Sequence, residues 1–141
     1  MNGPRCRKGF SLVEILISII LVGLSITALV IASNSFTQAN AAGADISTAE
    51  FLVEQIRERT AMMSFAEVAA MSDPPYTPPI DAHGNPLTAL ATFSQQVVVA
   101  YVNRTDFSTT AVSPTDFVRV TVTVALNGRP ISSASWIRAR Y

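Results

Sequence analysis

The feature that most constrains this chain is an apolar run near its N-terminus. From Phe10 to Ala32 the only ionisable side chain is that of Glu14. A helix needs about 20 predominantly apolar residues to cross the hydrocarbon core of a bilayer. The run meets that length, so it predicts a membrane-spanning helix over residues 10–32.

The flanking charges predict the orientation of this span. Arg5, Arg7 and Lys8 precede it, and the next basic residue is Arg57. The positive-inside rule then puts the N-terminus in the cytoplasm and the rest of the chain beyond the span outside it, in a single-pass protein of the cytoplasmic membrane. A cleaved secretory signal is the rival interpretation, with residues 28–32 imitating a cleavage site. Its apolar region usually runs for about 7–15 residues, which is shorter than the run found here.

Glu14 has no use in a simple membrane anchor. An ionised carboxylate at the centre of a bilayer costs about 2.5–3.5 kcal/mol on insertion scales. Glu14 lies near the cytoplasmic end of the span, so its carboxylate could reach the headgroups, and a tolerated interfacial charge is the plain alternative. An ionisable group within the membrane otherwise indicates a function and requires a partner.

The residues around Glu14 resemble a known N-terminal signature. Lys8-Gly9-Phe10-Ser11-Leu12-Val13-Glu14, followed by the apolar run, is similar to the N-terminus of type IV pilins and of the pseudopilins of type II secretion systems. The resemblance implies that residues 1–9 form a basic leader, which a prepilin peptidase removes after Gly9 before methylating the new Phe10 amine. It also implies that Glu14 is an assembly residue, which pairs with the Phe10 amine of a neighbouring subunit.

The same resemblance implies a structural role with no cofactor. Its partners would be the prepilin peptidase, other pilin or pseudopilin subunits, and an inner-membrane assembly platform. It leaves open whether the filament belongs to a type IV pilus, a type II secretion system or a competence machine. The alternative is an uncleaved anchor that displays a small binding domain outside the membrane. Only the filament subunit would begin at an N-methylated Phe10.

Residues 33–70 predict an amphipathic continuation of the helix. No proline occurs from the start of the span to residue 72. We expect any break at Gly23, Asn34 or Gly43, since glycine costs about 1 kcal/mol relative to alanine inside a helix. Apolar positions recur in steps of three and four, which marks one helix face, and we expect this face to pack on a sheet. The stripe consists of Ile46, Ala49, Val53, Ile56, Thr60 and Met63.

The rest of the chain predicts a small antiparallel sheet. Residues 71–90 form a proline-rich loop, with turn chemistry in "DAHGNP", and residues 91–141 form the β head. "FVRVTVTVAL" alternates with a period of two, which is typical of a strand with one buried face. Asn127-Gly128 then predicts a hairpin, and residues 93–103 supply a third strand. With the valine face packed on the helix, the fold class is α+β.

The C-terminal hairpin resembles the end of the minor pilins and pseudopilins called PilV-like or GspI-like, which favours a minor subunit. Other classes of function find little support. Cys6 is the only cysteine and would leave with the leader, and the only histidine, His83, lies in the turn without a second ligand at metal-binding spacing. No glycine-rich phosphate loop is present, and no basic run follows Lys8, so neither an enzyme nor a nucleic-acid-binding protein is expected.

Overall fold

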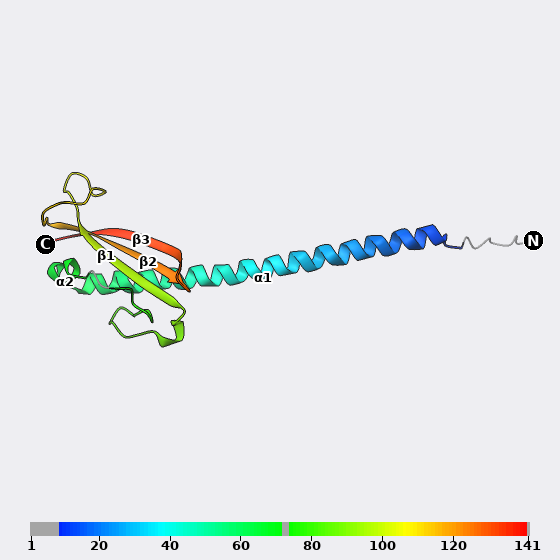
Figure 1. The fold of residues 1–141 in the computed structure, drawn as a ribbon, viewed down its shortest axis with the longest axis horizontal. Helices are drawn as coiled ribbons and strands as arrows, with labels where there is room; N and C mark the ends of the chain where they lie inside the picture. Colours follow the sequence, from blue (N-terminus) through cyan, green and yellow to red (C-terminus); the bar gives the residue numbers. More distant parts are fainter. Residues whose placement is uncertain (1–8, 72–73, 141) are drawn as a thin grey trace, which may run out of the picture. The chain divides into compact units, whose positions relative to one another are not determined.

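The computed structural model describes residues 9–71 and 74–140 (Figure 1). The chain divides into two compact units, Met1–Ala42 and Gly43–Tyr141. In its described part the first unit is the N-terminal portion of helix α1, which spans Leu12–Met62. The second unit holds the end of α1 packed against a three-stranded sheet. The predicted α+β fold, with an apolar N-terminal helix, is confirmed.

Helix α1 differs from expectation at its end. It continues through Gly23, Asn34 and Gly43 without a break, but it stops at Met62 instead of reaching residue 70. A separate short helix, α2 (Phe65–Ala69), follows.

The physical reason for the break is a capping box. The backbone N–H of Ser64 donates to Glu67 Oε2 at 2.7 Å, and the N–H of Glu67 donates to Ser64 Oγ at 3.4 Å. These bonds satisfy N–H groups at the start of α2 and hold Ser64 in an extended conformation that α1 cannot continue through.

The sheet has the order β1-β2-β3 and is antiparallel throughout. Its strands are β1 (Phe93–Tyr101), β2 (Phe117–Leu126) and β3 (Arg129–Ala139). The β2–β3 connection is the predicted hairpin, and both of its turn residues have positive φ, 50° at Asn127 and 80° at Gly128. Two such residues in succession are the mark of a type I′ turn, whose twist matches that of the strands.

The core lies between α1 and one face of the sheet. Val118, Val120, Val122 and Val124 of β2 are fully buried, as the alternation predicts. The helix contributes a face shifted slightly from the expected stripe. Ile46 is 47% exposed, whereas Leu52, outside the stripe, is fully buried. The buried α1 residues are Ala49, Leu52, Val53, Ile56 and Thr60.

The loop before β1 folds back on the core through the side chain of Gln95. This side chain is fully buried. Its Oε1 accepts from Ile80 N–H at 2.7 Å, and its Nε2 donates to Leu52 O at 2.8 Å and to Ile80 O at 3.2 Å. One amide therefore joins α1, the loop and β1.

The predicted turn within this loop is confirmed. Asp81 accepts hydrogen bonds from the backbone N–H groups of His83, at 2.9 Å, and Asn85, at 2.8 Å. The Asn85 side chain also donates to Asp81, and these bonds hold the pKa of the Asp81 carboxyl below its usual value. The loop ends in a short 3-10 helix, Thr88–Leu90.

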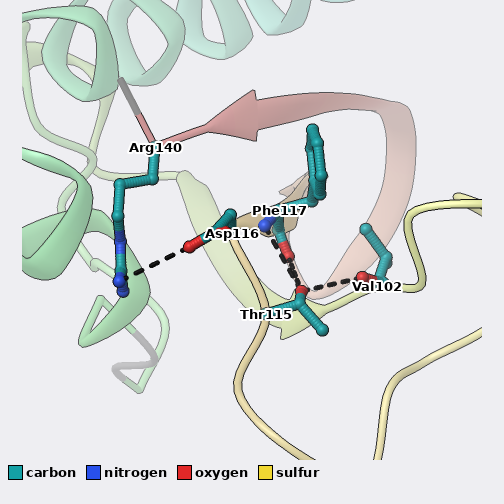
Figure 2. A network of polar contacts seen from close by, with 5 residues as sticks. All are labelled: Val102, Thr115, Asp116, Phe117 and Arg140. Atoms are coloured by element: carbon teal, nitrogen blue, oxygen red, sulfur yellow. Dashed lines mark hydrogen bonds and ion pairs between the residues drawn. The ribbon is translucent and has the colours of Figure 1, made fainter.

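The long β1–β2 connection is tied to the ends of the strands. Figure 2 shows Thr115, whose hydroxyl donates to Val102 O at 2.8 Å and accepts from Phe117 N–H at 3.3 Å. Asp116 forms an ion pair with Arg140 at 3.5 Å, beside the end of β3. These hydrogen bonds and the ion pair thus fix the end of the β1–β2 connection where β2 begins.

Candidate functional site

The candidate site is the N-terminal part of the first unit, where apolar side chains lie uncovered. Within the described residues, α1 is the one helix long and apolar enough to cross a membrane, with a mean hydropathy of 2.9 over its most apolar stretch and none of that stretch buried. A soluble domain would cover such a face, because exposing it to water is unfavourable by about 25 cal/mol per Å². The helix is therefore built for hydrocarbon or protein neighbours.

The serine and threonine hydroxyls in this apolar stretch are satisfied within the helix. Ser18, Ser25 and Thr27 each donate their hydroxyl to the carbonyl four residues earlier, at 2.7, 2.8 and 2.9 Å. Such bonds leave no hydroxyl in need of water, so these residues are compatible with lipid. The signal for these bonds is local, because all three residues lie inside the apolar run of the sequence.

The structure brings together the three residues assigned by sequence. Gly9 and Phe10 precede the helix, and Glu14 lies in its first turn. Together with Ser11 they line one surface hollow of about 330 Å³. Phe10 is 79% exposed. The peptide bond between Gly9 and Phe10 therefore shares a surface with the carboxylate of Glu14.

The backbone of Glu14 forms a hydrogen bond at the start of α1, whereas its side chain forms none with the described residues. Its N–H donates to Ser11 O at 3.0 Å, which begins the helix. Its carboxylate forms no hydrogen bond or ion pair with any other residue in the part of the chain that the structure describes. A carboxylate in the first helical turn interacts favourably with the helix dipole, but this effect is small beside the cost of charge in lipid. Among the described residues, Glu14 thus has no partner of the kind that its position requires.

Comparison with known families bears on this same segment. Residues 4–30 match the family described as the prokaryotic N-terminal methylation motif. The chain carries this methylation motif. The match supports the type IV pilin and pseudopilin family, and it does not specify the type of subunit. Comparison with curated proteins gave no match, and neither did comparison with solved structures.

The methylation motif covers Gly9, Phe10 and Glu14, and it ends before the second unit. The basic residues Arg5, Arg7 and Lys8, and also Cys6, lie outside the described residues. The motif and the uncovered apolar helix are together consistent with membrane anchoring.

The β head shows no comparable constellation of reactive groups. Across residues 9–71 and 74–140, no three His, Cys, Asp or Glu side chains gather where they could hold a metal ion. The backbone N–H of His83 is engaged in the Asp81 turn described above. The site with the strongest functional indication is therefore the methylation motif.

Proposed function

We propose that the protein is a structural subunit of a type IV pilus or type II secretion pseudopilus, of the minor pilin or pseudopilin kind. The observation that carries the proposal is the methylation motif at residues 4–30, in register with an uncovered apolar helix whose first turn bears Glu14. The subunit works by packing and charge pairing and has no catalytic chemistry of its own.

In the membrane stage, residues 10–32 span the bilayer with the N-terminus in the cytoplasm and the β head outside. Prepilin peptidase cleaves between Gly9 and Phe10 and methylates the Phe10 amine. The exposed position of both residues, before the first turn of α1, favours access by a peptidase. Cleavage removes Arg5, Arg7 and Lys8 and leaves a positive amine at the start of the apolar segment.

In the assembly stage, Glu14 pairs with the Phe10 amine of a neighbouring subunit. The Glu14 carboxylate has no ion-pair partner among the described residues, which supports this role, because a charge inserted in lipid gains most when it meets an opposite charge in a low-dielectric surrounding. Such a pair specifies the register of neighbouring helices more than it adds net stability. Van der Waals packing between the apolar helices supplies the remaining attraction.

The β hairpin supports the minor kind of subunit. The hairpin closes the β head with the Val/Thr strand β2, the tight Asn127-Gly128 turn and the final strand β3. This is the arrangement expected from its resemblance to PilV-like and GspI-like subunits. Whether the filament serves secretion, a pilus or DNA uptake depends on its partner subunits.

The test begins with the mature N-terminus of the protein isolated from its native membranes. We expect an intact mass lower by residues 1–9 and higher by one methyl group, with N-methylated Phe10 as the first residue. A chain that still begins at Met1, in a sample where the peptidase is active, would contradict the proposal and indicate an uncleaved anchor with a binding head.

The second part of the test separates processing from assembly. We expect Glu14→Ala to insert and to be cleaved normally, while its incorporation into filaments falls at least about tenfold, since a buried amine would lose its partner. Incorporation is measured from the filament fraction sheared from cells. Glu54→Ala is the matched control, because it removes a carboxylate from the same helix outside the apolar segment, and it should assemble normally. Normal incorporation of Glu14→Ala would refute the pairing role.

A further inference from the structure

The two edges of the sheet differ in what covers them. Backbone hydrogen bonds alternate along an antiparallel strand, so every second residue of an edge strand turns its N–H and C=O outward. On β1 these groups are paired near both ends. Gln95 exchanges two backbone bonds with Tyr76, at 2.9 and 3.1 Å, and Tyr101 O accepts from Ala111 N–H at 2.8 Å. Loop segments therefore blunt the β1 edge.

The edge formed by β3 is open. Arg140 N–H donates inward to Asp116 O at 2.8 Å, and the register pairs Arg138 with Val118 and Trp136 with Val120. The residues of β3 between these hydrogen-bonded pairs therefore point their backbone N–H and C=O groups away from β2. These residues are Ser133, Ser135, Ile137 and Ala139. Within residues 9–71 and 74–140, no backbone group outside the β2–β3 ladder pairs with them.

Protection of this edge is confined to the beginning of β3. Pro130 lacks an N–H, and the register shifts opposite Val124 and Ala125. Both features discourage pairing with a further strand, but only near the hairpin. From residue 132 to residue 139 the register is regular. A long, regular and uncovered edge is a template for strand addition.

A basic groove runs beside the open edge. It has a volume of about 180 Å³ and is lined by Arg57, Thr60, Ala61, Trp136, Ile137 and Arg138. The Arg57 guanidinium lies 5.9 Å from the centre of the Trp136 ring. Arg138 donates to Met63 O at 3.3 Å, while its buried Nε has no partner among the described residues. β3 itself carries Arg129 and Arg138 and no acidic residue.

We propose that the open edge of β3 binds an extended, acidic segment of another protein, which joins the sheet as a fourth strand. In this mode backbone pairing supplies affinity, and pockets for alternate side chains supply specificity. Carboxylates reaching into the groove would meet Arg57 and Arg138, with which they form charge-assisted hydrogen bonds.

Charge also argues against a second copy of this chain as the occupant. Pairing two β3 strands would bring their arginine-bearing ends together, and like charges across strands are destabilising. The binding surface belongs to the β head and does not depend on the filament role proposed above.

The test uses the full-length protein in detergent and a synthetic peptide of alternating valine and glutamate. Trp136 is the only tryptophan and lines the groove, so its fluorescence reports binding directly. We expect the acidic peptide to bind. A peptide with lysine in place of glutamate tests charge, and an acidic peptide N-methylated at alternate bonds tests backbone pairing without altering the protein. Both should bind at least about tenfold more weakly.

A matched pair of variants locates the site. We expect Arg57→Gln to weaken binding of the acidic peptide about fivefold, since Arg57 is largely exposed and screened. Arg104→Gln removes an exposed arginine from the β1–β2 loop and should change nothing. Failure of the acidic peptide to bind would overturn the proposal. Equal binding of either control peptide, or tighter binding of a single-stranded DNA oligonucleotide of equal charge, would also overturn it.

Discussion

Gln95→Leu removes the amide that joins α1, the loop before β1, and β1 itself. Leucine fills a similar volume without a polar group, so the substitution separates hydrogen bonding from packing. The Ile80 N–H loses the Gln95 Oε1 acceptor at 2.7 Å, and both Ile80 O and Leu52 O lose a donor. Leu52 O keeps its place in the helix, so Ile80 bears most of the loss.

The magnitude follows from these partners. A buried polar group left without a hydrogen bond costs about 1–3 kcal/mol. With the N–H of Ile80 fully deprived and its carbonyl partly so, we expect Gln95→Leu to lower the free energy of unfolding of the β head by about 2–4 kcal/mol. For a domain of this size the midpoint of thermal unfolding should fall by roughly 10 °C or more.

The assay is urea unfolding of the full-length protein in detergent, followed by Trp136 fluorescence. Thr121→Val is the matched control, because Thr121 lies on β2 facing away from the core and forms no hydrogen bond through its hydroxyl among the described residues. It should change the free energy of unfolding by no more than about 0.5 kcal/mol. A Gln95→Leu protein as stable as this control would refute the assignment of Gln95 as a structural link.

Two further predictions concern the capping box and the β1–β2 loop. Ser64→Ala should lower the free energy of unfolding of the β head by about 1 kcal/mol, because it removes the cap that begins α2. Urea unfolding measures this difference, and no change would count against the capping box. The hydroxyls of Ser108 and Thr109 and the Ser108 N–H hold the pKa of Asp106 at about 2, below its ordinary value. The stabilisation of the loop by these bonds is therefore complete above about pH 4 and is lost as the pH falls through about 2. The amide resonance of Ser108 should therefore titrate near pH 2, and this titration should be absent in Asp106→Asn. A midpoint near pH 4, about the ordinary value, would contradict the hydrogen-bonded loop.

The sequence predicted the elements whose signals are local. The β2–β3 hairpin follows from strict alternation of valine and from Asn127-Gly128, and neither depends on distant residues. The apolar run and Glu14 likewise stand out within one short segment. The end of α1 also had a local signal, Ser64 followed three residues later by Glu67, but the apolar stripe through Met63 predicted a longer helix.

What the sequence could not predict depends on contacts between distant segments. Gln95 lies within the polar run Ser94-Gln95-Gln96 and looks like a surface residue, although it shares the inward face of β1 with Phe93 and Val97. Only the returning loop reveals that it is buried. Leu52 takes the place of Ile46 in the core, because periodicity alone does not determine which helix residues a sheet covers. The difference between the two sheet edges arises from Tyr76 and Ala111, which are remote from β3 in the chain.

The serine and threonine hydroxyls of the apolar helix have a consequence for reversibility. Each is already bonded to a carbonyl of its own helix, so moving this segment from hydrocarbon to a protein neighbour breaks none of these bonds. The difference in free energy between the two surroundings would then rest on the fit between surfaces and on the two charged groups, Glu14 and the Phe10 amine. In the proposed assembly, the helix would leave the bilayer with only these two groups changing their partners.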